Sequence, residues 1–225
     1  MIPVTGGLPG TIVIPAPEFS RITAFTMSLT SMLVPQKSQI SWGIGMNVAT
    51  NVNGGIREML ARPQDQWVWI MGDDHTFEPE ILLRLLDRDV PAVVPICATR
   101  KPPFHGVAYE RLHDNPAGKW RPIPWDDYPA GGLMRVDAAG TAGMLLRRSV
   151  LETIPSPWME LARVESDSMS EDLWFCEKLR LAGIPLSVDT DQSIGHVALC
   201  TLWPRREKGQ IRTSLEFQYV PIGRL

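Results

Sequence analysis

The chain has 225 residues, 44% of them hydrophobic, and a net charge of -3. This length and hydrophobic content suffice for one large domain with its own core. The slightly acidic balance excludes a global basic field for polyanions and leaves any nucleic-acid contact to a local patch.

The three cysteines, Cys97, Cys176 and Cys200, are far apart in the sequence and stand in apolar surroundings. An odd number at such spacing predicts reduced core thiols and neither a disulfide framework nor a zinc cluster.

The N-terminal stretch lacks the basic start and apolar run of a signal peptide, and no segment is long and apolar enough to span a bilayer. We therefore expect a soluble, cytoplasmic protein without a transmembrane segment.

The first half of the chain alternates strand and helix patterns. Short apolar or β-branched runs stopped by turn residues predict strands, and apolar residues at helical spacing predict helices between them. Such alternation is typical of an α/β fold with a mostly parallel sheet and helices on both faces. The predicted strands cover residues 11–17, 38–47, 66–72 and 90–98, and the predicted helices cover 19–34, 53–61 and 78–87.

The second half begins with a segment that has no clear periodicity. Residues 99–137 are rich in Pro, Trp and Gly and are longer than loops normally are in a compact domain, which predicts a functional insertion or lid. Strand and helix patterns return at 140–154, 168–183 and 184–191. The basic, weakly periodic residues 201–225 form either an ordered flap or a loose end.

Two carboxylates and an imidazole, Asp73, Asp74 and His75, follow the most apolar predicted strand. In an open parallel sheet ligands bind beyond the carboxyl ends of the strands, where the loops at 15–18 and 47–53 also fall. Adjacent carboxylates repel each other, so their joint presence at this edge indicates a bound cation. The alternative is that they cap the next helix, whose N-terminus favours negative charge.

A second acidic pair, Glu171 and Asp172, opens the helix predicted at 168–183. Ser168 and Glu171 have the spacing of a capping box, which gives Glu171 a structural role. Asp172 has no such role and stands at the mouth of the helix, where it can accept a proton from a hydroxyl. The alternative for Asp172 is a surface carboxylate that stabilises the helix dipole.

His196 follows Gly195 at the end of the last predicted strand. A single histidine is usually a satisfied polar residue. One that follows two acidic clusters in an alternating α/β chain is a candidate metal ligand.

Four motifs stand in this order along the chain: WVWIMGDDHTFEPEILLRLL, VDAAGTAGMLLRRSVLETI, SEDLWFCEKLRLAG and VDTDQSIGHV. Their order and spacing resemble the nucleotide-diphospho-sugar glycosyltransferases of the GT-A fold, especially the family 2-like enzymes of phage and bacterial genomes. The resemblance covers residues 11–198 and implies a GT-A, Rossmann-like fold. It implies one domain at 1–200, with a nucleotide-binding part at about 10–98 and an acceptor-side part at about 99–200.

The resemblance implies roles for the first acidic cluster. In that family an Asp-x-Asp motif at a strand end binds the metal and the ribose. Counting back from the next helix places its second Asp at Asp74 and its first at Gly72. Asp74 and His196 are then the expected metal ligands, for Mn²⁺ or Mg²⁺. Asp73 becomes a metal or ribose contact, and His75 a further candidate ligand.

The family's nucleotide pocket uses the turn after the first strand and an Asn-rich segment. Val52 stands where an Arg would contact the pyrophosphate, and Arg57 or Arg100 can substitute for it. Ordinary turn chemistry explains Asn51 and Asn53 equally well. The residues that the resemblance assigns to this pocket are Pro15, Ala16, Glu18, Asn51, Asn53, Asp73 and Arg100.

By the same resemblance the chain is a metal-assisted glycosyltransferase that uses a nucleoside-diphosphate sugar as donor. Asp172, with Glu171 beside it, is the expected catalytic base on the acceptor hydroxyl, which favours inversion at the anomeric carbon. Candidate acceptors are a glycan, a lipid, a protein hydroxyl or a modified DNA base. Two alternatives stay open. One is a nucleotidyltransferase, against which the lack of a glycine-rich, basic phosphate loop counts, and the other is a non-catalytic nucleotide-sugar-binding protein.

Overall fold

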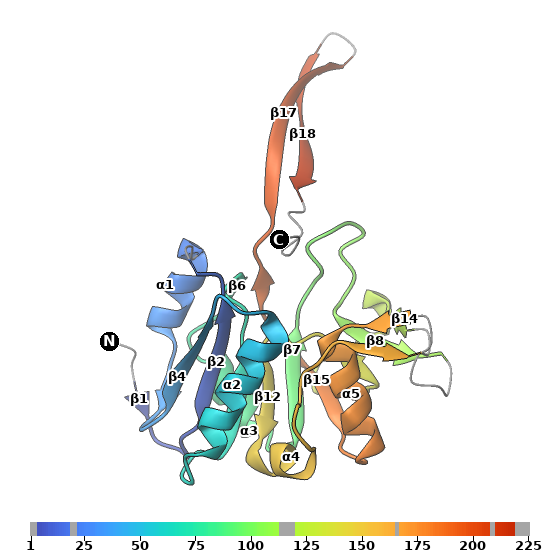
Figure 1. The fold of residues 1–225 in the computed structure, drawn as a ribbon. Coiled ribbons are helices and arrows are strands. Elements are labelled where there is room, and N and C mark those ends of the chain that lie inside the picture. Colours follow the sequence, from blue (N-terminus) through green and yellow to red (C-terminus); the bar gives the residue numbers. More distant parts are fainter. Residues whose placement is uncertain (1–3, 19–21, 113–119, 165–166, 208–209, 219–225) are drawn as a thin grey trace.

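The computed structural model describes residues 4–18, 22–112, 120–164, 167–207 and 210–218. A seven-stranded sheet forms its centre, in the order β10-β15-β7-β12-β5-β2-β4 (Figure 1). Strands β4, β2, β5, β7 and β15 run in one direction, whereas β12 and β10 run antiparallel to their neighbours. The strand bounds are β2 Thr11–Ala16, β4 Gln39–Ile44, β5 Trp67–Ile70, β7 Ala92–Ile96, β10 Leu133–Val136, β12 Met144–Arg147 and β15 Leu186–Ser193. The expected α/β fold with a mainly parallel sheet is confirmed.

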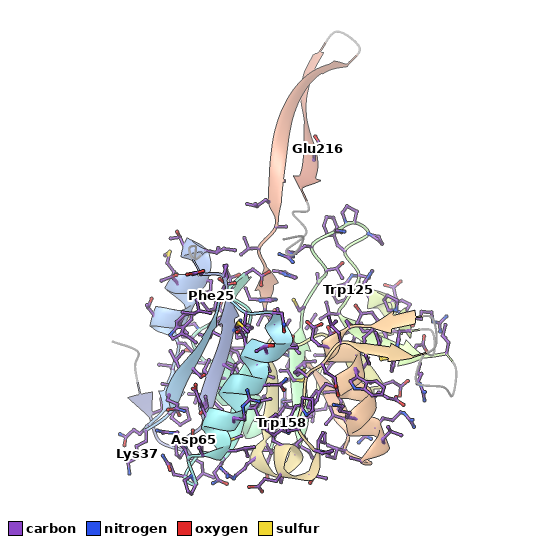
Figure 2. The ribbon with its side chains drawn as sticks, in the orientation of Figure 1. Phe25, Lys37, Asp65, Trp125, Trp158 and Glu216 are labelled. Atoms are coloured by element: carbon purple, nitrogen blue, oxygen red, sulfur yellow. The ribbon has the colours of Figure 1, made fainter. Side chains whose placement is uncertain are left out.

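Helices cover both faces of this sheet. On one face α2, α4 and α5 pack over a core that includes Ile56, Trp158 and Phe175, and on the other α1 and α3 pack over a core that includes Phe25 and Leu82. Figure 2 labels Trp158 and Phe25 in these two cores. The helix bounds are α1 Thr23–Ser31, α2 Val48–Leu60, α3 Ile81–Asp87, α4 Arg148–Thr153 and α5 Glu171–Leu181.

The sequence of β5 explains how one strand serves both cores. Its four residues are all buried, and successive side chains of a strand point to opposite faces. Val68 and Ile70 therefore join the core under α2, and Trp67 and Trp69 join the core under α1 and α3. A strand buried on both faces is a continuous apolar run, which is why the sequence predicts it so clearly.

Helix α2 begins five residues earlier than the predicted helix at 53–61. Asn47 is its N-cap, and the Asn47 side chain accepts a hydrogen bond of 2.9 Å from the backbone N–H of Thr50. Capping by Asn stabilises a helix start by about 1 kcal/mol. This places the first turn of α2 directly beyond the carboxyl end of β4.

Buried Asp65 lies at the end of the sheet where β2 and β5 begin, opposite to their carboxyl ends (Figure 2). Its Oδ2 accepts hydrogen bonds from Thr11 Oγ1 at 2.6 Å and from Arg62 Nε at 3.0 Å. The turn before β5 is thereby tied to the start of β2. Both strands then run from this fixed end toward the edge where the predicted site residues lie.

The prediction that residues 99–137 lack regular structure is wrong for parts of the segment. Strands β8 (Ala108–Arg111), β9 (Trp120–Pro122) and β11 (Ala138–Ala139) form a second, antiparallel sheet, and β10 joins the edge of the main sheet. A 3₁₀ turn, η1 (Trp125–Asp127), follows β9. Trp120, Ile123 and Tyr128 pack against the main core. The segment is an insertion, as expected, but a folded one.

Short strand pairs complete the structure. β1 (Val4–Thr5) pairs with β3 (Val34–Pro35), and β13 (Ala162–Val164) pairs with β14 (Asp167–Met169). Of the two alternatives for the basic tail, the described part is ordered: β17 (Leu199–Glu207) and β18 (Gln210–Gln218) form a hairpin that projects from the body (Figure 1). No helix in the described part of the chain is both long and apolar enough to cross a bilayer.

Candidate active site

The carboxyl ends of the parallel strands bring three separate loops together. His75 lies in β6 (His75–Thr76), which follows β5, and His196 lies in β16 (Gly195–His196), which follows β15. These two short strands pair antiparallel with His75 opposite His196. The imidazole rings stack with their centroids 4.4 Å apart. Residues 121 positions apart in the chain thus share one edge of the sheet.

The Asp74 carboxylate contacts both of these imidazoles. Its Oδ1 is 3.0 Å from His75 Nδ1, and its Oδ2 is 3.2 Å from His196 Nε2. Arg100, in the loop after β7, places Nη1 at 2.9 Å from the same Oδ2. We call Asp74, His75, Arg100 and His196 the Asp74 cluster.

The cluster keeps Asp74 ionised. Burial alone raises the pKa of this carboxyl, but hydrogen bonds and electrostatic interactions with His196 and His75 outweigh it and hold the pKa well below its ordinary value. A partly buried carboxylate with a fixed negative charge is the kind of group that binds a cation.

The two histidines fit a metal ion through their nitrogen lone pairs. His75 Nδ1 faces two oxygen acceptors, Asp74 Oδ1 and the Gly72 carbonyl at 3.2 Å, so it carries the proton. His75 Nε2 then offers a buried lone pair, and no described group donates a hydrogen bond to it. His196 also faces oxygens with both nitrogens, Ala98 O at 2.9 Å and Asp74 Oδ2. A neutral imidazole has one proton, so one of these contacts needs an imidazolium or a bound cation.

Gly72 makes the compact arrangement sterically allowed. A Cβ at this position would lie 2.9 Å from Asp74 Oδ1 and 3.1 Å from His75 Nδ1. The space beside Gly72 is therefore filled by the side chains of Asp74 and His75. Asp73, the next residue, is half-exposed in the same turn and remains a predicted metal or ribose contact.

The residues expected around the nucleotide lie at the neighbouring strand ends. Pro15 and Ala16 end β2, and Glu18 Oε2 lies beside Gly45 in the loop after β4. The Asn51 amide donates to the Met46 carbonyl at 3.1 Å and so holds that same loop. These four predicted residues thus lie at neighbouring strand ends on the same edge of the sheet.

The Asn53 side chain forms its hydrogen bonds with the segment after α4 and not with the residues expected around the nucleotide. Its Oδ1 accepts hydrogen bonds from the backbone N–H groups of Trp158 and Met159, at 3.0 and 2.9 Å, and its Nδ2 donates to Met159 O at 2.6 Å. The side chain is buried and engaged at both ends. Asn53 anchors the segment after α4 to α2, which is a structural role that the sequence did not indicate.

The second acidic pair stands at the start of α5, but the predicted capping box is wrong. The N-cap is Ser170, and Ser168 lies in β14. The Ser170 hydroxyl donates a short hydrogen bond to Asp172 Oδ1, which also accepts from the Leu173 N–H at 2.8 Å. Glu171 is half-buried, and burial together with the charge of Asp172 raises its pKa. The capping argument therefore does not separate the roles of Glu171 and Asp172.

Two backbone hydrogen bonds connect the acidic pair with the Asp74 cluster. A Cβ on Gly140 would lie 3.7 Å from Asp172 Oδ2, so this oxygen faces Gly140. The Gly140 N–H donates to Val107 O, and the Val107 N–H donates to the carbonyl of Cys97, at 2.8 and 3.0 Å. Cys97 in turn lies beside His75 and His196. The structure thus brings both predicted clusters to the same side of the molecule.

Cys97 is the residue that sequence reasoning missed. It was expected to be an inert core thiol, and it is buried, with its pKa raised to about 12 by burial and by the charge of Asp74. It also stands one residue beyond β7, at the edge where the other candidate residues meet. Its place near the carboxyl end of the strand predicted at 90–98 was the available signal.

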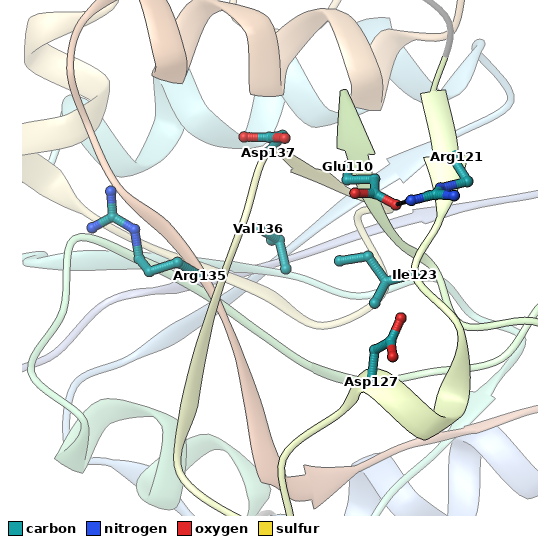
Figure 3. Close-up of a pocket in the computed structure, with 7 residues that line it drawn as sticks. All are labelled: Glu110, Arg121, Ile123, Asp127, Arg135, Val136 and Asp137. Carbon is teal, nitrogen blue, oxygen red and sulfur yellow. Dashed lines mark hydrogen bonds and ion pairs between the residues drawn. The ribbon is translucent and has the colours of Figure 1, made fainter. Parts of the chain in front are cut away.

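A separate cavity of about 500 Å³ lies in the insertion (Figure 3). Its polar lining includes the ion pair of Glu110 with Arg121. None of its lining residues belongs to the Asp74 cluster or to the acidic pair. They are Glu110, Arg121, Ile123, Asp127, Arg135, Val136 and Asp137.

Comparisons with known proteins agree with this architecture. No protein-family model matches the chain, and no curated protein matches it. Among solved structures, A197 from STIV has a TM-score of 0.56 at 12% identity, over 96% of this chain and 97% of that one. GalNAc-T7, in a crystal structure with UDP, GalNAc and Mn²⁺, has a TM-score of 0.57 at 9% identity, over 90% of this chain.

These likenesses define the class of fold. The chain has a GT-A-like, Rossmann-type α/β fold, and at such identities the likeness shows the fold alone. The chain spans 44% of the length of GalNAc-T7.

Proposed function

We propose that this protein is a glycosyltransferase that moves a sugar from a nucleoside-diphosphate sugar to a hydroxyl acceptor with the help of a divalent cation. The observation that carries the proposal is the Asp74 carboxylate, ionised and in contact with His75 and His196 at the carboxyl edge of a GT-A-like sheet. The presence of UDP, GalNAc and Mn²⁺ in the GalNAc-T7 structure supports these ligand classes.

The residues that would hold the cation are Asp74, His75 and His196, with Asp73 beside them. A bound Mn²⁺ or Mg²⁺ would offset the negative charge that develops on the leaving diphosphate. Arg100 now pairs with Asp74 and is partly exposed. Because a cation at Asp74 repels a guanidinium, Arg100 is free to bind a diphosphate oxygen once the site is filled.

Asp172 is the proposed base. Its Oδ1 is held by Ser170 and Leu173, which leaves Oδ2 facing Gly140. Because glycine has no side chain, an acceptor hydroxyl can approach Oδ2 from this side. Removal of its proton by Asp172 as it attacks the anomeric carbon would invert that centre. Glu171, whose pKa is raised, is the second candidate for the proton.

A second function has one observation in its favour. The Asp74 charge is already balanced by His75, His196 and Arg100, and Gly72 leaves no second carboxylate at the usual motif position. A non-catalytic nucleotide-sugar-binding protein would retain such a self-balanced cluster.

Calorimetry followed by a donor-hydrolysis assay separates these functions. The chain is stripped of metal and titrated with UDP or GDP, with and without Mn²⁺ or Mg²⁺. We expect metal-dependent nucleotide binding and hydrolysis of a matching donor sugar. Tight binding of nucleotide and intact donor without hydrolysis or transfer would support the non-catalytic function.

Asp74→Ala tests the site itself. We expect this variant to lose metal-dependent nucleotide binding, because the ionised ligand is gone. Asp87→Ala is the matched control, since Asp87 is an exposed carboxylate at the end of α3. If Asp74→Ala binds Mn²⁺ and nucleotide as tightly as the parent, the assignment is wrong. If the parent chain is active, mass spectrometry of host glycans and DNA after its expression would identify the acceptor.

A further inference from the structure

Three side chains near the Asp74 cluster form a ligand set of mixed nitrogen and sulfur character. The ligand atoms of His75, Cys97 and His196 all lie within 4.8 Å of one another. Cys97 Sγ and His196 Nδ1 both contact the Ala98 carbonyl, at 3.6 and 2.9 Å. The thiol is therefore held beside the imidazole by a shared acceptor and does not merely pack in the core.

His75 supplies a second and independent observation. The residue is 5% exposed, and its Nε2 has no hydrogen-bond partner among the described residues. Burying such an atom without a partner costs about 1–3 kcal/mol. A cation that accepts its lone pair removes this cost, and histidines that bind metal through one nitrogen commonly bond the other to an oxygen acceptor, as His75 Nδ1 does here.

We infer that Cys97 Sγ binds the metal ion together with His75 and His196, so that the site prefers Zn²⁺ or Co²⁺ to Mg²⁺. Thiolate and imidazole ligands favour borderline-soft cations, whereas Mg²⁺ requires oxygen ligands. As the Cys97 sulfur binds the cation, the thiol proton passes to solvent. The inference rests on the proposed function, since it names the kind of cation that serves the same diphosphate site.

Cobalt binding without nucleotide tests the sulfur ligand directly. The protein used is the full chain with Cys176→Ser and Cys200→Ser, which leaves Cys97 as its sole cysteine. Added to this metal-free double variant, Co²⁺ should produce an intense near-ultraviolet band from thiolate-to-cobalt charge transfer. The further change Cys97→Ser should remove that band. Absence of the band from the double variant, or its persistence after Cys97→Ser, overturns the inference.

Calorimetry with the metals alone gives the selectivity. Zn²⁺ should bind the parent chain at least about a hundredfold more tightly than Mg²⁺, and Cys97→Ser should reduce this ratio by at least about tenfold. Cys176→Ser is the matched control, since Cys176 is also buried but bonds the backbone of Ala139. Equal ratios in the parent and Cys97→Ser contradict a sulfur ligand. If Cys97→Ser does not fold by circular dichroism, Cys97→Ala replaces it with the same two outcomes.

Failure of the sulfur ligand can be told apart from failure of the proposed glycosyltransferase function. Mn²⁺-dependent donor hydrolysis by a chain without the cobalt band overturns the sulfur ligand and leaves the glycosyltransferase standing. A cobalt band in a chain that binds neither UDP nor GDP supports the metal site and overturns the glycosyltransferase.

Discussion

Two carboxylate groups on the same side of the molecule are held in opposite ways. Asp74 is faced by His75, His196 and Arg100, and its pKa is lowered despite burial. At the start of α5, neither acidic residue forms an ion pair with a basic group in the described part of the chain, and burial raises the pKa of Glu171. The first environment holds a permanent charge, which suits ligand binding. The second keeps a carboxyl group able to exchange a proton, which suits acid–base chemistry.

Asp172→Asn, at the start of α5, should have the largest effect of these changes, which is on the transfer rate. An amide cannot take the acceptor's proton, so the transfer rate should fall by about 10²–10⁴-fold. Nucleotide affinity should stay near that of the parent, because the Asp74 cluster is intact. Steady-state kinetics and calorimetry measure the two quantities. Ser170→Ala is the control: it removes only the hydroxyl that orients Asp172 and should cost less. Retention of most of the transfer rate by Asp172→Asn, with an inactive but folded Glu171→Gln, would exchange the two roles.

Asn53→Ala separates stability from binding. It leaves the backbone groups of Trp158 and Met159 without their buried partner, so the free energy of unfolding should fall by about 3 kcal/mol. Nucleotide affinity of the folded chain should not change. Urea unfolding and calorimetry give the two values. Asn51→Ala, which loses a single bond to Met46, should cost less. A stable Asn53→Ala chain that no longer binds nucleotide would restore Asn53 to the pocket.

Gly72→Ala tests how the packing around Asp74 affects cation affinity. Its Cβ would approach Asp74 Oδ1 to 2.9 Å and displace the carboxylate from His75. Cation affinity should fall by about 10–100-fold, as for other changes that reorient ligands, with little effect on the acidic pair. Gly54→Ala is the control, since no atom lies within 4 Å of its Cβ and helix propensity favours Ala. Unchanged cation affinity in Gly72→Ala would show that the close contact is unimportant.

Glu171→Gln has the smallest expected effect, which is a change in how the stability of the fold depends on pH. The ordinary pKa of this carboxyl is 4.5 and its folded pKa is higher. The stability that this group contributes is thus fully present below about pH 4.5 and is lost as pH rises through the folded pKa. Glu171→Gln, which cannot ionise, should therefore melt above the parent at pH 7 and equal to it at pH 4. Calorimetry at both pH values checks this, and a lower melting temperature at pH 7 would instead support a capping role.

The sequence predicts those features that depend on local pattern. The buried strand before Asp74, the alternation of strands and helices, and the position of His196 at a strand end all follow from periodicity and chain order. Features set by distant contacts could not be predicted. Asn53 resembles a turn residue until Trp158 and Met159 are placed against it. Cys97 resembles a core thiol until β6 and β16 bring two imidazoles to it.

The helix start at α5 shows a different limit. Ser168 stands three residues before Glu171, which is the spacing of a capping box, whereas Ser170 is followed three residues later by Leu173. The pairing of β13 with β14 extends to Met169 and leaves Ser170 as the N-cap. Pairing between strands, which the sequence pattern does not reveal, therefore decided where the helix begins.

The antiparallel strand β12 has a consequence for how the molecule can be divided. It comes from the second half of the chain but lies between β5 and β7, both from the first half. A fragment that ends near residue 98 would leave those two strands without the partner that joins them, and two open edges would be exposed to other chains. The parts of the chain before and after residue 98 therefore share one sheet. Separately expressed halves should aggregate alone and regain structure only when mixed.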